Sequence, residues 1–421
     1  MKVLIINISM IGDNDATGIT LNNLFEGLPG VKIMQICVDT VNREYHSQKE
    51  KVLFIEPASV PFDLIIRKTL RLFVKTGNLK LGPKSGLVPQ KGVKNALHDF
   101  LRGLIDMSPV FLTKAFKQKI DAFKPDVIYT MGANIRTLRL SNYFTKRFYI
   151  PAVLHLMDNW PKTIYTTSSL SKFARYSLLT ELRKLHSRSK LCLSISNEMA
   201  QIYSKRYGVN YETVGNIFDL DDRFLYEENR DGEKDDVFTL VYAGGLHLNR
   251  YKSLKMLAMV IENMKTDKKI VLHLYVPKED KLGYKDLLNY DFAIFHSYLN
   301  KDDLINVYKN SDCLVHVESF DENIYEFIRY SISTKIPEYV GCGKPILCLA
   351  PDSIAVSKFI SENKVGYVAD NEKSLEAGLN ILLNDKKAYE DFVNNAKTVS
   401  LQFKRYVVQE KLMNALGQGK R

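Results

Sequence analysis

One stretch of the chain, SISTKIPEYVGCGKPI at residues 331–346, combines residue types that bind an anion. It predicts a short helix capped by Ser333 or Thr334, because a hydroxyl accepts hydrogen bonds from the N–H groups of a first helical turn. Lys335 then places a cation at the positive end of that helix, which the helix dipole disfavours by about 0.3–1 kcal/mol. A bound phosphate would remove this penalty. The alternative is a surface lysine at a frayed helix start.

A second stretch, LVYAGGLHLNRYKSL at residues 240–254, joins a predicted strand to a helix expected to begin near Ser253. Gly244 and Gly245 allow a close turn. Arg250 and Lys252 precede the helix, where cations oppose its dipole, so an anion bound between them would explain both. The alternative is a solvated basic turn.

The third stretch, VLHLMDNWP at residues 153–161, is a predicted strand end that presents polar and aromatic side chains. Asp158 is a candidate to hold or deprotonate an acceptor hydroxyl, which requires a base within hydrogen-bonding reach. Trp160 offers an apolar face to a sugar ring, and Asn159 lies beside it. The alternatives are a strand histidine at His155 whose bonds are all satisfied, and a core anchor at Trp160.

The first predicted turn, at residues 9–20, contains the Asp13-Asn14-Asp15 triplet and two glycines. The triplet imitates a D-x-D metal motif, but two acids around an asparagine are usually turn formers, so we expect no metal site. The glycines do not follow the G-x-G-x-x-G spacing, which argues against a dinucleotide site.

Two sets of alternating strands and helices must position these stretches. Their apolar runs lack strict alternation, as expected for parallel strands buried on both faces, and open sheets of this doubly wound kind bind ligands at the carboxyl ends of their strands. The first set has predicted strands at 3–6, 32–38, 52–55, 127–129, 152–156 and 191–195, and helices at 17–28, 62–76, 112–123 and 169–185. The second set has predicted strands at 238–243, 270–276, 292–296, 313–317, 346–349 and 365–369.

The 421 residues exceed one ordinary core, so we expect two α/β domains. The acidic stretch at 218–236 is the predicted linker. The predicted boundaries are 1–217 and 218–388 for two Rossmann-like domains and 389–421 for C-terminal helices.

Composition and charge limit the classes of binding partner and the compartment that the sequence favours. No apolar run reaches the roughly 20 residues of a membrane span, and the five scattered cysteines show no metal spacing and favour a reducing, cytoplasmic compartment. Residues 1–215 have 31 Lys and Arg against 16 Asp and Glu, whereas the rest has 28 against 32. The basic half therefore suggests an anionic membrane, an acidic substrate or a nucleic acid. The aromatic and basic interleaving of a nucleic-acid binder is not found.

The segment SxSTKIPEYxxxGKPI resembles the donor-site segment of a subgroup of family 4 glycosyltransferases, GT-B enzymes that build bacterial surface polysaccharides. Most of that family has an E-x7-E pattern whose second Glu holds the nucleotide ribose. Glu338 matches this second Glu, while Tyr330 stands where the first would fall. Glu318 and Glu326 have the same spacing but lack the Gly-Pro context, so we discount them. VLHLMDNWP resembles the strand-end loop of the same subgroup.

The resemblance implies roles for the remaining residues. His155 would hydrogen-bond the transferring sugar, Arg250 and Lys252 would neutralise the donor diphosphate, and Gly18 would lie near the donor phosphates. The implied donor-binding set is Gly18, Gly244, Gly245, Arg250, Lys252, Ser333, Thr334, Lys335 and Glu338. His155 and Asp158 would be catalytic, and Asn159 and Trp160 would bind the acceptor.

The resemblance therefore implies two Rossmann-like domains facing across a cleft, an acceptor-side domain at 1–217 and a nucleotide-sugar-binding domain at 218–388, with the helices of 389–421 crossing back to the first domain. It also implies transfer of a sugar from a nucleotide-sugar to a saccharide or lipid-linked saccharide. Anomeric configuration would be retained, and no cofactor or metal would be needed. Two other functions stay open, a nucleotide-sugar 2-epimerase of the same fold and a non-enzymatic basic binding protein.

The segment at residues 62–84 has the composition of a helix that lies in a membrane interface, because apolar residues alternate with Arg67, Lys68, Arg71 and Lys75. It predicts peripheral association with the anionic inner face of the cell membrane, where each basic residue contributes about 1 kcal/mol. The alternative is an amphipathic helix that packs on its own sheet.

Overall fold

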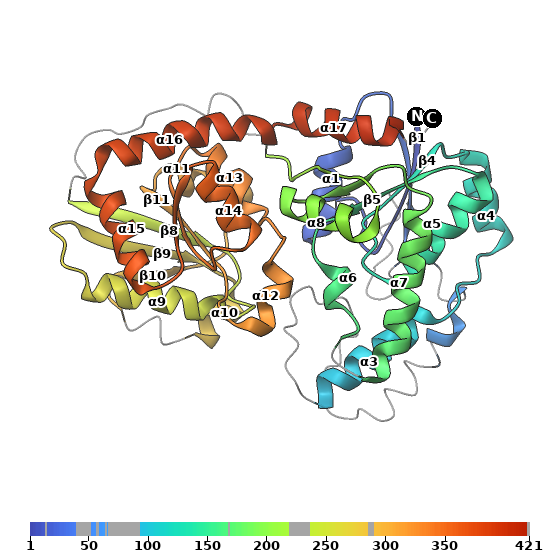
Figure 1. Cartoon of the computed structure of the whole chain (residues 1–421), viewed down its shortest axis with the longest axis horizontal. Helices are drawn as coiled ribbons and strands as arrows, with labels where there is room; N and C mark the ends of the chain where they lie inside the picture. Colours follow the sequence, from blue (N-terminus) through green and yellow to red (C-terminus); the bar gives the residue numbers. More distant parts are fainter. Residues whose placement is uncertain are drawn as a thin grey trace. The chain divides into compact units, whose positions relative to one another are not determined.

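The structure is a computed structural model that describes residues 1–12, 15–38, 52–55, 59–63, 65, 93–166, 169–218, 236–284 and 290–418. The described residues form two compact units (Figure 1). The first unit contains those up to Gly215 together with those from Val408 onward, and the second contains those of Asn216–Val407.

The first unit is built on a seven-stranded parallel sheet in the order β3-β2-β1-β4-β5-β6-β7. The chain order reverses between β1 and β4, the central pair in which Val3 lies opposite Val127. The strands are β1 (Lys2–Asn7), β2 (Lys32–Cys37), β3 (Val52–Phe54), β4 (Val127–Thr130), β5 (Ala152–Leu156), β6 (Cys192–Ser194) and β7 (Tyr211–Thr213). The helices are α1 (Ala16–Phe25), α3 (Val93–Met107), α4 (Lys114–Phe123), α5 (Ile135–Phe148), α6 (Trp160–Thr163), η2 (Ser169–Ser171), α7 (Lys172–His186) and α8 (Asn197–Tyr207).

The second unit is built on a six-stranded parallel sheet in the order β10-β9-β8-β11-β12-β13. Here the order reverses between β8 and β11. The strands are β8 (Val237–Ala243), β9 (Lys269–Tyr275), β10 (Ala293–His296), β11 (Cys313–Val317), β12 (Ile346–Leu349) and β13 (Gly366–Ala369). The helices are α9 (Arg250–Asn263), α10 (Lys278–Gly283), α11 (Lys301–Lys309), α12 (Glu322–Ile328), α13 (Lys335–Gly341), α14 (Ala355–Glu362), α15 (Glu372–Asn384), α16 (Lys386–Ser400), η5 (Leu401–Phe403) and α17 (Arg405–Gln418).

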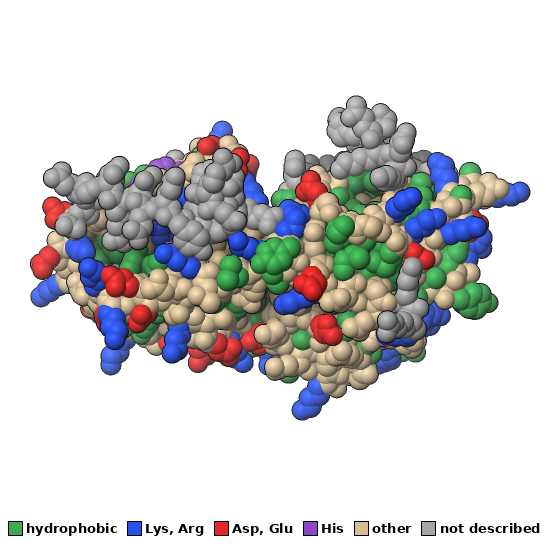
Figure 2. Space-filling view, turned by 90° about the horizontal axis from the view of Figure 1, so that it is seen from above, with side chains coloured by type: hydrophobic (Ala, Val, Ile, Leu, Met, Phe, Trp, Pro, Cys, Tyr) green, Lys and Arg blue, Asp and Glu red, His purple; other side chains and the backbone are tan. Residues whose placement is uncertain are grey.

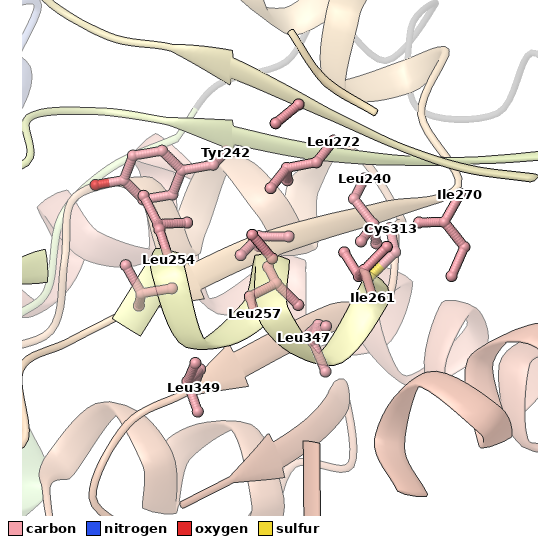
Figure 3. Close-up of a cluster of buried hydrophobic side chains, with 14 of the residues drawn as sticks. Leu240, Tyr242, Leu254, Leu257, Ile261, Ile270, Leu272, Cys313, Leu347 and Leu349 are labelled. Atoms are coloured by element: carbon pink, nitrogen blue, oxygen red, sulfur yellow. The ribbon is translucent and has the colours of Figure 1, made fainter. Parts of the chain in front are cut away.

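Two apolar clusters cover the faces of the second sheet, which explains why its strands read as continuous apolar runs. Figure 3 shows the first cluster, where Leu254, Leu257 and Ile261 of α9 pack on the sheet. The other cluster includes Ile336, Tyr339 and Val340 of α13 and residues of α14. Helices α9 and α13 are therefore fixed on the sheet by their apolar sides. This packing also fixes the positions of their first residues, Arg250 and Lys335.

The doubly wound α/β prediction is confirmed, with two Rossmann-like domains. Strand β7 was not predicted, because only Tyr211 of its three residues is buried. Helix α9 begins at Arg250, three residues before the predicted start. The predicted helix at 62–76 and the predicted linker at 218–236 fall mostly outside the described residues.

The end of the chain is helical, as predicted. Helix α17 starts in the second unit, and its residues from Val408 onward belong to the first unit. There Gln409 Nε2 donates hydrogen bonds to the carbonyl oxygens of Leu24 and Glu26, at 3.2 and 2.8 Å. These bonds satisfy carbonyl groups at the C-terminal end of α1. Within the described part of the chain, the helices are all too short or too polar to span a membrane.

Candidate active site

The central strands of the second sheet end at the point where functional side chains gather. Strand β8 leads into the Gly244–Gly245 turn, and its neighbour β11 leads directly into Glu318. The turn is fixed from two sides: Tyr242 Oη donates to the carbonyl oxygen of Gly245 at 2.8 Å, and Leu246 N donates to Asp280 Oδ2 at 2.7 Å. A reversal of strand order at the carboxyl edge is where open α/β sheets bind ligands.

Lys335, the first residue of α13, reaches this turn. A Cβ atom added at Gly244 would lie 1.8 Å from Lys335 Nζ, and Gly244 also has a φ of 145°. Position 244 therefore requires glycine for both reasons. Lys335 Nζ lies 5.3 Å from the centroid of the Tyr242 ring, a cation–π contact. The structure thus brings three predicted site residues together: Gly244, Gly245 and Lys335.

The charge of Lys335 is poorly compensated. Burial, and then the positive charge of Arg250, lower the pKa of Lys335 to about 8. In the described part of the chain, Lys335 forms no ion pair with a carboxylate. A phosphate placed beside Nζ would supply the missing negative charge. Lys335 is therefore held against the Gly244–Gly245 turn rather than at the surface of a frayed helix, and its role in binding an anion stays a prediction.

Arg250 is held by a carboxylate that the sequence interpretation had discounted. Its Nε and Nη2 donate to the two oxygens of Glu318, at 3.0 and 2.9 Å, and the side chains are 16% and 6% exposed. Burial opposes ionisation of Glu318, but the charge of Arg250 prevails and lowers the pKa of Glu318 to about 2. His316 Nε2 lies 3.4 Å from Glu318 Oε1, and burial lowers the pKa of His316. Arg250 is therefore a fixed cation that is already paired.

Lys252 lies on the exposed side of the same turn. Its Nζ donates to Asp321 Oδ2 at 2.9 Å, and its side chain is 53% exposed. Asp321 also accepts a hydrogen bond from Asn249. Lys252 therefore sits in a solvent-exposed ion pair, unlike Arg250.

The capping predicted for α13 differs in detail. The hydroxyl of Thr334 makes no capping bond, and Ser333 Oγ accepts only a long bond of 3.4 Å from Lys335 N. Of the two predicted capping residues, Ser333 therefore supplies a hydroxyl to the first N–H group of α13, through a long bond, and Thr334 does not. Glu338 lies one turn into the helix, where burial raises the pKa of its carboxyl. Tyr330, at the position of the missing first Glu, is buried beside the guanidinium of Arg329.

In the first unit, His155 lies inside the sheet. It is fully buried on β5, with Nδ1 2.7 Å from Tyr129 Oη and Nε2 2.9 Å from the carbonyl oxygen of Val214. The carbonyl requires Nε2 to carry the proton, so Nδ1 accepts from the tyrosine. Burial lowers the pKa of His155 to about 4. These contacts match the alternative of a satisfied strand histidine and leave neither ring nitrogen for a substrate.

The residues after β5 divide between surface and core. Asp158 is exposed, and its Oδ1 accepts from Trp160 N at 2.9 Å. Asn159 is buried and accepts a hydrogen bond from Tyr203 Oη. Trp160 is 4% exposed and donates from Nε1 to the carbonyl oxygen of Met131 at 3.1 Å. Asp158 is thus the member of the predicted acceptor group that reaches the surface, while Asn159 and Trp160 are placed as core anchors.

Gly18 lies in the first turn of α1, where its N–H donates to Asp15 Oδ1 at 2.7 Å. Asp15 therefore acts as a helix cap, the turn-forming role expected for this triplet. Asp13 and Asn14 are outside the described residues. Over the described ranges, no group of three or more His, Cys, Asp and Glu side chains is arranged to bind a metal ion.

The fold of this chain, two doubly wound units with charged residues at the carboxyl edge of the second, matches that of GT-B structures. Residues 227–399 match the family model described as glycosyl transferases group 1. A comparison with curated protein sequences finds no match. The family match and the fold class together support a glycosyltransferase.

Solved structures match over the full length of the chain. HepE from Anabaena, in complex with UDP, has a TM-score of 0.62 and 13% identity, covering 99% of this chain and 100% of that one. The galactosyltransferase WaaB of the lipopolysaccharide outer core has a TM-score of 0.61 and 12% identity, covering 99% of each chain. Sucrose-phosphate synthase from Thermosynechococcus elongatus has a TM-score of 0.62 and 13% identity, covering 99% and 98%. At such identities the likeness shows the fold.

Proposed function

We propose that this protein transfers a sugar from a nucleotide-sugar to a saccharide or lipid-linked saccharide in the synthesis of a cell-surface polysaccharide. The proposal rests on Lys335, a poorly compensated cation directed at the Gly244–Gly245 turn where the second sheet reverses its strand order. The HepE structures contain UDP and UDP-glucose, and WaaB is named as a galactosyltransferase. These names support a nucleotide-sugar as the donor.

The site supplies the electrostatics that the reaction needs. Breaking the bond between the sugar and its nucleotide leaves negative charge on the diphosphate, and fixed cations that stabilise this charge lower the barrier. Lys335 would contact the diphosphate directly. Arg250, fixed by Glu318, would add positive potential without moving. Glu338 would bind the ribose hydroxyls, as the family resemblance implies.

On the acceptor side we propose Asp158, whose exposed carboxylate would orient or deprotonate the attacking hydroxyl. Surrounding protein raises the pKa of Asp158, and the hydrogen bond from Trp160 N opposes that rise. A base with a raised pKa takes a proton more readily at neutral pH. Asn159 and Trp160 would shape the loop that presents it. By the family resemblance, transfer would retain the anomeric configuration.

We propose that the reaction is independent of metal, because protein cations take the place of a divalent ion at the diphosphate. The test is turnover after exhaustive treatment with EDTA. Activity should persist. A complete loss of activity that Mn²⁺ restores would contradict the proposal and make Asp13 and Asp15 the candidate metal ligands.

A lipid-linked acceptor would place the enzyme in the cytoplasm, peripherally at the inner face of the membrane. The first unit carries the basic charge, and Figure 2 shows Lys and Arg side chains at several places on one of its faces. Phe173 and Tyr176 near the start of α7 are 77% and 71% exposed. Exposed aromatic residues beside basic ones are typical of proteins that dock on anionic lipid.

The deciding experiment separates the candidate functions by their products. The protein is incubated with a panel of UDP- and GDP-sugars, with and without saccharide acceptors, and nucleotide and sugar products are identified by mass spectrometry. A transferase releases nucleoside diphosphate in proportion to glycosylated acceptor. An epimerase would change the donor sugar without any acceptor, and a binding protein would change neither.

A further inference from the structure

A pocket lies within the first unit, and none of its lining residues belongs to the candidate active site. It has a volume of about 290 Å³ and lies between the side of α5, the segment that joins α3 to α4, and α4 itself. This volume is at the lower end of the range for small-molecule sites. Its lining includes Leu112, Lys117, Arg136, Leu140 and Tyr143.

The lining is basic as well as apolar. Among the described lining residues, Lys117, Arg136 and Arg139 are cations and none is an acid. Arg139 is tied to the carbonyl oxygen of Met107 and, at 2.9 Å, to Ser177 Oγ. Lys117 is partly exposed and forms no ion pair in the described part of the chain. Arg136 is paired with Asp63, so the positive potential that a negatively charged ligand would meet comes mainly from Lys117 on α4 and Arg139 on α5.

Arg136 provides an independent indication of a ligand. It is 4% exposed, and its two Nη atoms donate to Asp63 and neighbouring oxygens, including Oδ2 of Asp63 at 2.7 Å. Among the residues that the structure describes, its buried Nε has no hydrogen-bond partner. A buried N–H group of a cation is rarely left unpaired in a native protein, because it loses its hydrogen bonds to water and gains none in exchange. An acceptor oxygen in the pocket would satisfy it.

The walls are suited to a short apolar group. Arg136, Leu140 and Tyr143 lie four and three residues apart on α5 and share one helical face. Leu140 is buried, while Tyr143 is 38% exposed and stands at the rim. Leu112 closes the opposite side.

We propose that this pocket binds a small organic anion, a phosphate monoester or carboxylate attached to a short apolar group. The acidic head would lie between Lys117 and Arg136, and the apolar group would contact Leu112 and Leu140. This site does not depend on the proposed glycosyl transfer, since none of its residues belongs to the donor or acceptor sets.

Calorimetric titration of the full chain with hexyl phosphate tests the proposal, with hexanol and inorganic phosphate as half-ligand controls. Hexyl phosphate should bind saturably with one molecule per chain, and each control at least about tenfold more weakly. Lys117→Gln should weaken binding roughly two- to fivefold, the range measured for partly exposed charges. Leu112→Trp, which fills the apolar side, should abolish binding. Lys119→Gln, on the exposed face of the same helix, should leave it unchanged.

Several results would overturn this assignment. They are equal weakening by Lys117→Gln and Lys119→Gln, binding of hexanol as tight as that of hexyl phosphate, or no saturable binding of hexyl phosphate to the unmodified, folded chain. A lipid source of the anion is distinguished by vesicles with and without phosphatidic acid. If the ligand is a lipid head group, phosphatidic acid vesicles displace hexyl phosphate. If it is a soluble ester, they do not.

Discussion

Lys335 is held where its own charge is disfavoured. Its folded pKa of about 8 lies below that of an unfolded lysine, so at neutral pH the folded protein retains a proton that its surroundings oppose. By linkage, the free energy of unfolding should rise as pH rises through this pKa, where the folded protein sheds the proton before the unfolded chain does. A destabilised cation of this kind is what a site for a diphosphate requires.

Replacement of Lys335 by methionine should therefore separate stability from binding. Lys335→Met keeps the length of the side chain and removes the disfavoured charge, so we expect a higher melting temperature without ligand. Affinity for the donor nucleotide should fall tenfold or more. Differential scanning fluorimetry and calorimetry measure the two effects. Lys184→Met, which removes an exposed charge paired with Glu181 in the first unit, is the control and should change both by much less.

The affinity for donor should also depend on pH. Because only the protonated Lys335 attracts a diphosphate, the dissociation constant should increase as pH rises above about 8. Calorimetric titration between pH 6.5 and 9.5 measures this dependence. In Lys335→Met the dependence should disappear, and a slope equal to that of the unmodified protein would assign it to another group.

Glu338→Ala should weaken binding of the nucleotide-sugar more than it changes stability. Loss of charged hydrogen bonds to the ribose removes on the order of 1.5–3 kcal/mol of binding free energy. Calorimetry gives the binding term and urea denaturation the stability term. Glu322→Ala, an exposed carboxylate at the start of α12, is the matched control. Normal donor binding by Glu338→Ala would show that the family motif has been assigned wrongly.

At the scale of elements, Arg250 and Glu318 join the start of α9 to the end of β11. Glu318→Gln leaves the buried guanidinium without a counter-charge, so we expect a loss of about 3–5 kcal/mol in the free energy of unfolding. Asp321→Asn breaks the neighbouring exposed pair with Lys252, and its effect should stay below about 1 kcal/mol. Urea denaturation of both variants measures the contrast, and equal effects would contradict the role of burial.

The strands could be predicted from sequence because buried parallel strands are short, continuous apolar runs. Strand β7 was missed, since Tyr211 is buried alone and gives no such run. Predicting the site was harder. The contacts that satisfy His155 come from Tyr129 and from Val214, which is 59 positions along the chain. Glu318 was discounted because its local context did not match the family pattern, although its place directly after a buried strand was visible in the sequence.

For the whole molecule, we expect binding to anionic membranes. The fraction that co-sediments with liposomes should rise with their content of anionic lipid and fall with salt. Replacement of Arg67, Lys68, Arg71 and Lys75 by serine tests the segment predicted from sequence, most of which lies outside the described residues. Phe173→Ser with Tyr176→Ser tests the exposed aromatic pair of α7. No binding at any lipid composition would leave a soluble acceptor as the explanation for the charge.

The five cysteines are buried thiols, two in the first unit and three in the second. Burial raises the pKa of four of them, to about 12 for Cys192, Cys342 and Cys348 and further for Cys313. A thiol reagent can therefore react with each one efficiently only when the secondary structure around it opens. Mass spectrometry of timed alkylation would then report how often each unit opens. The alkylation rates of these cysteines thus report local opening in each unit separately. A nucleotide-sugar that binds the second unit should slow labelling of Cys313, Cys342 and Cys348 more than that of Cys37 and Cys192.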